Sequence, residues 1–184
     1  MVQLIQIIIS LLTLGFTIWI PIKVSWEQQY SSLLDEYRGF DYAIAYQGIV
    51  QFFANECGGD MERVKEVYKN RFLDELENRK PEEIKKEQCL HFQRRLLAQF
   101  FWQLNECTNH HVITKKRIAR DFSNAEANLV KILIYMGEAI DNDEIMYKDI
   151  SSAATAKRPD HLRGQNKGLS EMYQILKQSK RYIG

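Results

Sequence analysis

Residues 1–22 read MVQLIQIIISLLTLGFTIWIPI and contain no charged side chain. As an α-helix, this stretch extends roughly 33 Å, which matches a hydrocarbon core about 30 Å thick. Trp19 and Trp26 lie on either side of Lys23, a pattern typical of the aromatic and cationic belt at a membrane interface. We therefore predict a transmembrane helix over residues 1–22, with the lipid bilayer as its surroundings.

A cleavable signal peptide and a buried core helix are the two alternatives for this stretch. A signal peptide needs a cation before the apolar run, a shorter apolar core and a small-residue cleavage site, and the sequence shows none of them. Few soluble core helices are apolar on every face over such a length. Gln3 and Gln6, one turn apart, are costly in lipid and favour a hydrogen bond to a partner helix.

The flanks of the apolar stretch predict its orientation. The side-chain cation beside it, Lys23, follows it, so the positive-inside tendency places residues 23–184 in the cytoplasm and the N-terminus outside. Three cysteines, Cys57, Cys89 and Cys107, are odd in number and widely spaced, which is typical of a reducing compartment.

The composition of the 184-residue chain fits one modest domain. Hydrophobic residues make up 45% of it and charged residues 27%, which excludes a low-complexity or wholly disordered polymer. The formal net charge of +1 gives the chain no global field that would attract nucleic acid, so nucleic acid is not an expected partner.

An apolar heptad-like pattern follows the predicted membrane span. It comprises Trp26, Tyr30, Leu33, Tyr37, Phe40 and Ile44. This spacing predicts one helix from residue 26 to about residue 57, bent near Gly48 and stopped by Gly58-Gly59. The chain's own bundle or another chain must cover the aromatic face of this helix. The candidate partner-contact residues on that face are Trp26, Tyr30, Tyr37 and Phe40.

Periodicity and capping residues predict the remaining helices, and no segment alternates as a strand does. The predicted helices cover 61–78, 81–109 as the central helix, 115–122 with Thr114 as its cap, and a segment to about Ile140 that begins with a Ser123–Glu126 capping box. The fold class is therefore all-α, with a cytosolic bundle of four or five helices over residues 23–150.

Residues 151–184 differ from the rest in charge and composition. We expect a linker over 151–167 and a short amphipathic helix over 169–182, with a net charge of +5 against −4 for residues 1–150. This basic tail favours contact with anionic lipid headgroups, an acidic partner face or a nucleic acid, the last disfavoured by the overall charge. Candidate membrane or partner contacts are Arg158, Arg163 and Lys167 in the tail, and the basic cluster Lys115, Lys116, Arg117 and Arg120.

The sequence contains no motif that assigns catalysis. Cys89 and Cys107 are separated by roughly 27 Å on one predicted helix, too far apart to share a zinc ion. The nucleophile elbow and the phosphate-binding loop are absent, so we predict no catalytic residue, metal or cofactor. An enzyme would need a polar pocket in which perturbed side chains converge, with Glu106, His110 or Asp141 as the candidates.

Two short blocks carry a resemblance to a known family. Residues 94–101 read RRLLAQFF and residues 118–122 read IARDF. With the apolar span, they resemble a family of small bacterial proteins that have one N-terminal membrane helix and a cytosolic helical domain of unknown function. The resemblance covers about residues 1–140. It implies this architecture and a bacterial inner membrane, and it transfers no catalytic residue.

Together these patterns favour a single-pass membrane-anchored interaction or scaffold protein with a protein partner or as a homo-oligomer. The expected organisation is a transmembrane helix at 1–22, a bundle at 23–150 and a basic tail at 151–184. One alternative is a membrane-acting effector of a bacterial stress or antiphage system, which would use residues 1–22 to perturb the bilayer. A helical enzyme is the less favoured alternative.

Overall fold

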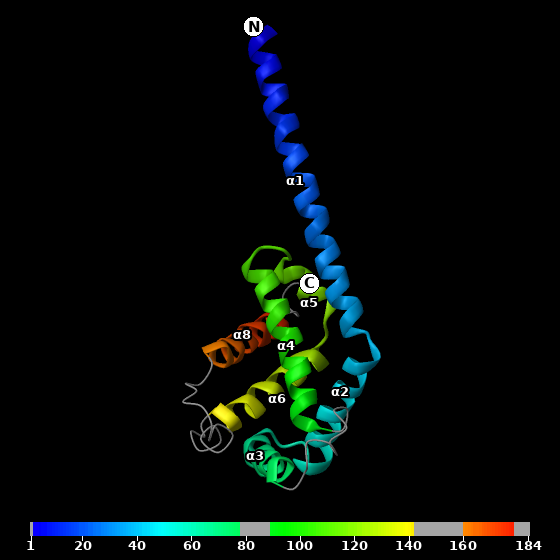
Figure 1. Ribbon diagram of the computed structural model, residues 1–184, viewed down its shortest axis with the longest axis vertical. Coiled ribbons are helices and arrows are strands. Elements are labelled where there is room, and N and C mark those ends of the chain that lie inside the picture. The colour runs from blue at the N-terminus through cyan, green and yellow to red at the C-terminus, as the bar shows by residue number, and fades with distance from the viewer. Residues whose placement is uncertain (1, 78–88, 142–159, 179–184) are drawn as a thin grey trace.

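The computed structural model describes residues 2–77, 89–141 and 160–178, and these residues form helices and turns without a strand (Figure 1). The all-α class is therefore confirmed. The helices are α1 (Val2–Tyr37), α2 (Phe40–Gln51), the π-helix η1 (Phe52–Glu56), α3 (Met61–Glu77), α4 (Leu90–Asn109), α5 (Lys115–Asp121), α6 (Asn124–Asp141) and α8 (Asp160–Lys177).

Helix α1 has two parts in different surroundings. Its N-terminal part extends away from all other helices, while its last turns pack against the bundle (Figure 1). Large apolar side chains of the extended part are about half exposed, for example Leu12 at 58% and Trp19 at 54%, whereas Tyr30 is 1% exposed. The helix runs without interruption through residue 22, where the sequence placed the end of the membrane span.

Helix α4 is the central helix, as the sequence predicted. It packs against α2, α6, α8 and the end of α1, and α3 packs against α6. Its buried apolar side chains are Leu90, Leu97, Ala98, Phe100, Phe101, Leu104 and Cys107. The predicted start near Pro81 lies within residues 78–88, outside the described residues. Cys89 has extended backbone angles, so α4 begins at Leu90 and a single helix over 81–109 is wrong.

The predicted continuous helix over 26–57 is also wrong, because the chain turns between α1 and α2. Gly39 has extended backbone angles of φ −65° and ψ 161°. A Cβ there would lie 2.8 Å from the carbonyl oxygen of Glu36, so this turn requires glycine. Phe40, which the heptad pattern placed on the buried face, is 78% exposed as a result.

The end of this helical region near residue 57 is confirmed, and its irregularity differs from the predicted bend. Helix α2 continues as the π-helix η1, and Gly58 and Gly59 have positive φ values of 65° and 75°. Gly48 instead provides space, because a Cβ there would lie 2.1 Å from Oε1 of Gln93 on α4. The glycine therefore brings α2 close to α4.

Both predicted N-terminal caps near α5 and α6 are confirmed. The Thr114 hydroxyl accepts a hydrogen bond from the Arg117 N–H at 3.3 Å. Before α6, the Ser123 N–H donates to the Glu126 carboxylate at 2.8 Å, and the Ala125 N–H donates to the Ser123 hydroxyl at 3.1 Å. These bonds satisfy backbone donors that a helix start leaves unpaired.

The prediction of a linker over 151–167 is wrong for residues 160–167, which form the first turns of α8. Residues 151–159 lie outside the described residues. The amphipathic helix therefore begins at Asp160 rather than near Leu169. Leu169, Met172 and Leu176 are fully buried against α4 and α6, so α8 belongs to the bundle and shares its core.

A buried polar cluster joins α3 to α4. The Nδ1 atom of His91 lies 3.1 Å from the Tyr68 hydroxyl, and the buried Glu75 carboxylate accepts from Arg71 Nε at 3.2 Å. Burial, with the nearby cations Arg94 and Arg95, lowers the pKa of His91 to about 3. His91 is therefore neutral in the folded protein near pH 7.

This shift predicts a loss of stability in acid. Between pH 6.5 and pH 3 the unfolded chain binds a proton at His91 that the folded chain excludes, so stability falls as pH falls, by at most about 1.4 kcal/mol per pH unit. We expect His91→Gln to flatten this slope in urea unfolding of the detergent-solubilised chain from pH 7 to pH 4. The exposed His110→Gln is the control, and an equal flattening in that control would contradict the assignment.

Candidate functional site

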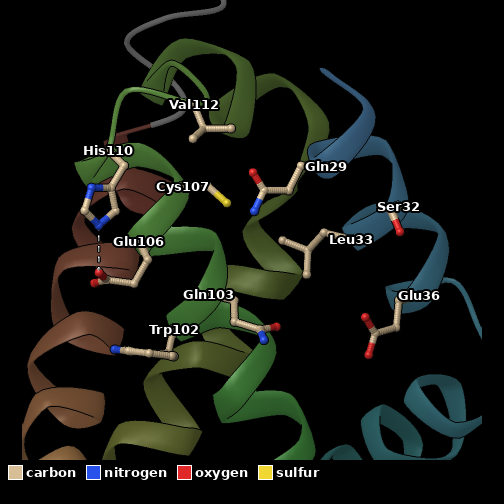
Figure 2. A pocket seen from close by; sticks show the side chains of 10 residues that line it. All are labelled: Gln29, Ser32, Leu33, Glu36, Trp102, Gln103, Glu106, Cys107, His110 and Val112. Atoms are coloured by element: carbon tan, nitrogen blue, oxygen red, sulfur yellow. Dashed lines mark ion pairs between the residues drawn. The ribbon is translucent and has the colours of Figure 1, made fainter. Parts of the chain in front are cut away.

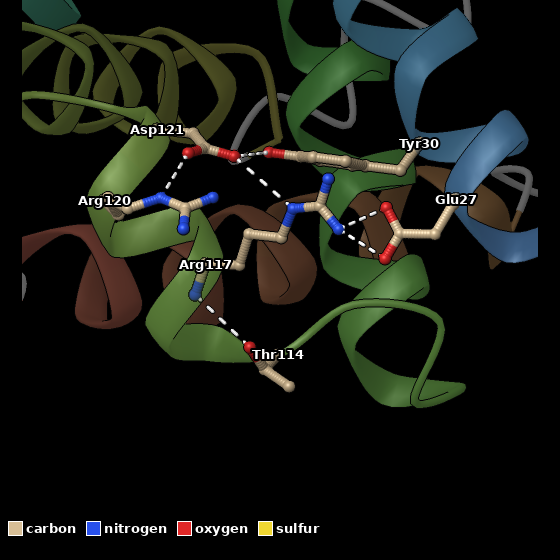
Figure 3. Close-up of polar contacts among 6 residues, drawn as sticks. All are labelled: Glu27, Tyr30, Thr114, Arg117, Arg120 and Asp121. Carbon is tan, nitrogen blue, oxygen red and sulfur yellow. Dashed lines mark hydrogen bonds and ion pairs between the residues drawn. The ribbon is translucent and has the colours of Figure 1, made fainter. Parts of the chain in front are cut away.

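Four side chains join α1 to the bundle where its exposed part ends, and we call them the junction: Glu27, Tyr30, Arg117 and Asp121. The Arg117 guanidinium donates to both carboxylate oxygens of Glu27 and lies over the Tyr30 ring, with Cζ 4.8 Å from the ring centroid (Figure 3). The Tyr30 hydroxyl donates to Asp121 Oδ2 at 2.8 Å. The junction therefore links α1 to α5 through charge, ring and hydrogen-bond contacts.

Helical spacing brings these groups together. Glu27 and Tyr30 lie three residues apart on one face of α1, and Arg117 lies four residues before Asp121 on α5, with Nε 3.7 Å from Oδ2. The hydrogen bond from Arg117 lowers the pKa of Glu27. Burial, followed by the Asp121 carboxylate, raises the pKa of Tyr30. At neutral pH the junction therefore holds charged Glu27 and a protonated phenol.

An aromatic cluster surrounds the C-terminal end of α1, about two turns after Tyr30 of the junction. Tyr37, at the end of α1, stacks on Phe100 of α4 with ring centroids 4.3 Å apart and planes at 16°. Phe101, Phe122 and Tyr42 complete the cluster at centroid distances near 6 Å from Tyr37. The end of α1 is thus fixed by ring packing as well as by the junction.

The structure separates the four aromatic residues predicted to contact a partner. Tyr30 is buried in the chain's own core, so its assignment as a partner contact is wrong, and Tyr37 is partly buried against the same core. Of the two covers that the sequence left open, the chain's own bundle is the one used for this part of α1. Trp26 is partly buried, and Phe40 projects into solvent.

The four residues of the predicted basic cluster also fall into two groups, one paired with carboxylates and one exposed. Arg117 is committed to the junction, and Arg120 donates to Asp121 Oδ1 at 3.0 Å while remaining 69% exposed. Lys115 and Lys116 are exposed at the start of α5, the helix that contacts α1 at Glu27. Helix α5, on which these two lysines lie, is at the end of the bundle nearest the extended part of α1 (Figure 1).

The candidate contacts in the tail fall on α8 and on the segment before it. Lys167 is exposed on α8. Arg163 lies within α8, but its side chain is outside the described part of the structure, as is the whole of Arg158. Helix α8 packs on the bundle through its buried side chains Leu169, Met172, Ile175 and Leu176.

An open groove of about 520 Å³ lies between α1 and α4 on another side of the bundle (Figure 2). It contains the enzyme candidates Glu106, which is partly exposed, and His110, which is exposed; their Oε2 and Nε2 atoms are 3.6 Å apart. Burial and Glu106 raise the pKa of the Cys107 thiol, opposite to the shift that activates a nucleophilic cysteine. The lining residues are Gln29, Ser32, Leu33, Glu36, Trp102, Gln103, Glu106, Cys107, His110 and Val112.

The third enzyme candidate, Asp141, ends α6, and its side chain lies outside the described residues. Among the residues that the structure describes, no three His, Cys, Asp or Glu side chains gather where they could hold a metal ion. The groove brings the carboxylates Glu36 and Glu106 together with His110, and its walls are of mixed polarity.

Sequence reasoning missed the acidic half of the junction. The Arg117–Asp121 pair was visible as an i, i+4 pair of opposite charge. Glu27 is separated from Arg117 by 90 residues, and nothing in a single sequence indicates such a contact. The only local signal for Glu27 was its location directly after Trp26, which was expected at the end of the apolar stretch.

In its described residues the chain has one helix long and apolar enough to cross a membrane by length and composition. A scan with protein-family models and searches of curated proteins and solved structures found no match. Function is therefore inferred from α1 and its junction with the bundle.

The partly buried hydrogen bond between Tyr30 and Asp121 gives a stability prediction. Tyr30→Phe removes the donor and leaves the Asp121 carboxylate short of one partner, so we expect a loss of about 2 kcal/mol in the free energy of unfolding. Tyr30→Phe in an Asp121→Asn background should cost clearly less, because the charged acceptor is already gone. Tyr135→Phe is the control, and an equal loss there would contradict the assignment; urea unfolding of the detergent-solubilised chain measures all four variants.

Proposed function

We propose that this chain is a single-pass membrane-anchored interaction or scaffold protein. Residues 1–22 lie in the bilayer, and the helical bundle binds a protein partner at the membrane surface. The supporting observation is that the most apolar part of α1 has none of its side chains buried, while its continuation is packed in the core. An apolar surface of this size is unfavourable in water and favourable in lipid.

The proposed location is a bacterial inner membrane, with the N-terminus outside and the bundle in the cytoplasm. Lys23 after the span and the lack of Lys or Arg before it support this orientation. The family resemblance supports the bacterial membrane. Helix α5 lies at the end of the bundle nearest the extended part of α1, and its exposed Lys115 and Lys116 would then be available to anionic headgroups.

Continuity of α1 determines how the bundle is held in this proposal. From Ile22 to Tyr30 the helix rises about 12 Å, so the junction lies close to the headgroups. Because no loop separates the span from the bundle, the bundle cannot swing freely. The groove beside α1 then lies at a fixed distance from the membrane surface, where a partner can reach it. Its carboxylates Glu36 and Glu106 favour a basic partner segment.

Charges placed in the apolar segment test this proposal. Arg near the centre of a membrane helix raises the free energy of insertion by about 3 kcal/mol. We expect the full-length Ile8→Arg/Leu12→Arg variant to be lost from the carbonate-washed membrane pellet, and the Ile8→Val/Leu12→Val control to remain there. A wild-type chain that stays in the supernatant without detergent would contradict the proposal. A C-terminal reporter active only in the cytoplasm checks the orientation.

A further inference from the structure

The apolar segment of α1 has a polar face. Every Gln, Ser and Thr side chain of residues 1–22 belongs to one set, spaced alternately by three and four residues, which we call the polar stripe. Each member is exposed. The polar stripe comprises Gln3, Gln6, Ser10, Thr13 and Thr17. Spacing of this kind places all five on one side of the helix, as the a and d positions of a heptad.

The bundle leaves this side of α1 open. Successive residues turn by about 100° around an α-helix, so the centre of the polar stripe lies about 150° from the face that carries Tyr30, Leu33, Leu34 and Tyr37. That second face is the one packed on the bundle. A helix that approaches along the polar stripe therefore meets none of the bundle helices that the structure describes.

The polar stripe has hydrogen-bonding capacity that lipid does not satisfy. The Thr13 and Thr17 hydroxyls donate to the Ile9 and Thr13 carbonyls at 2.8 and 2.7 Å, and each oxygen can still accept a bond. Gln3, Gln6 and Ser10 line a shallow hollow on the surface of α1 with Ile7 and Leu14. In hydrocarbon, the amide groups of the two glutamines require a partner that both donates and accepts.

Pro21 adds a backbone acceptor on the same side. Proline has no N–H, so the Thr17 carbonyl lacks the donor that residue 21 of an α-helix would otherwise supply. Thr17 belongs to the polar stripe, and residue 21 lies one turn later on the same side of α1. The backbone therefore has unsatisfied hydrogen-bonding capacity where the side chains do.

We propose that the polar stripe binds the polar stripe of a second copy of this chain, as a parallel pair of α1 helices. This inference rests on the proposed membrane anchoring. Two copies inserted with the same topology are parallel, and a two-fold pair sets each stripe residue opposite itself. Glutamine amides and hydroxyls are self-complementary in this arrangement because each both donates and accepts. The polar stripe carries no charge, which favours an identical face over a charged partner helix.

Disulfide cross-linking of the full-length chain in membranes tests the pairing. Ser10→Cys places a thiol on the polar stripe, and Ile8→Cys places one about 160° away on the same helix. We expect oxidation to give a dimer of twice the chain mass for Ser10→Cys and at least tenfold less for Ile8→Cys. The wild-type chain, with Cys57, Cys89 and Cys107, is the background control. An adduct with another protein, or equal cross-linking at both positions, would overturn the inference.

A composition-matched variant separates pairing from anchoring. Gln3→Ile/Gln6→Ile/Ile5→Gln/Ile8→Gln keeps the composition of α1 and moves both amides off the polar stripe. In the Ser10→Cys background we expect this variant to remain in the membrane pellet and to lose dimer on the order of tenfold. Undiminished dimer in the pellet would overturn the pairing alone. A wild-type chain in the supernatant would overturn the anchoring and the pairing together.

Discussion

The packing of the last two turns of α1 into the core is the constraint on which the rest of the structure depends. Tyr37 stacks on Phe100 in a five-ring cluster, and the Tyr30 hydroxyl donates a hydrogen bond to Asp121. Burial of each large apolar side chain contributes about 1.5 to 3 kcal/mol, and aromatic pairs add about 1 kcal/mol. This packing ties the direction of the extended apolar segment to the bundle.

Helix α1 therefore has two parts with different surroundings. Its N-terminal part is apolar on most sides and carries the polar stripe, while its C-terminal part buries one face and exposes the other. Glu27 marks the change, because it is the first carboxylate of the chain and is bound by Arg117 from α5. The face that packs on the bundle and the exposed apolar segment thus meet within a few residues of α1.

Local signals predicted much of the bundle. Periodicity and caps located α3, α5 and α6, because their apolar faces and capping side chains lie close together in sequence. The turn at Gly39 was missed because Tyr37, Phe40 and Ile44 retain helical spacing across it. In α8, Gly168 suggested a linker, but the glycine is required by packing: a Cβ there would lie 2.7 Å from Cδ1 of Trp102.

Contacts between distant segments were beyond the reach of a single sequence. The Glu27–Arg117 pair depends on how the helices pack. The same packing decides whether the chain's own bundle or another chain covers Tyr30. The apolar character of residues 1–22 was predictable, since it requires only composition and length. Gln3 and Gln6 made part of the polar stripe visible in the sequence. Only the structure shows that the polar stripe faces away from the bundle.

The most direct test of the account measures depth in a bilayer. Spin labels placed singly at Leu12 and at Ser31 of the full-length chain in vesicles report collisions with oxygen, which concentrates in lipid, and with a water-soluble nickel complex. The account predicts oxygen-dominated collisions at position 12 and nickel-dominated collisions at position 31. Nickel-dominated collisions at position 12 would contradict it.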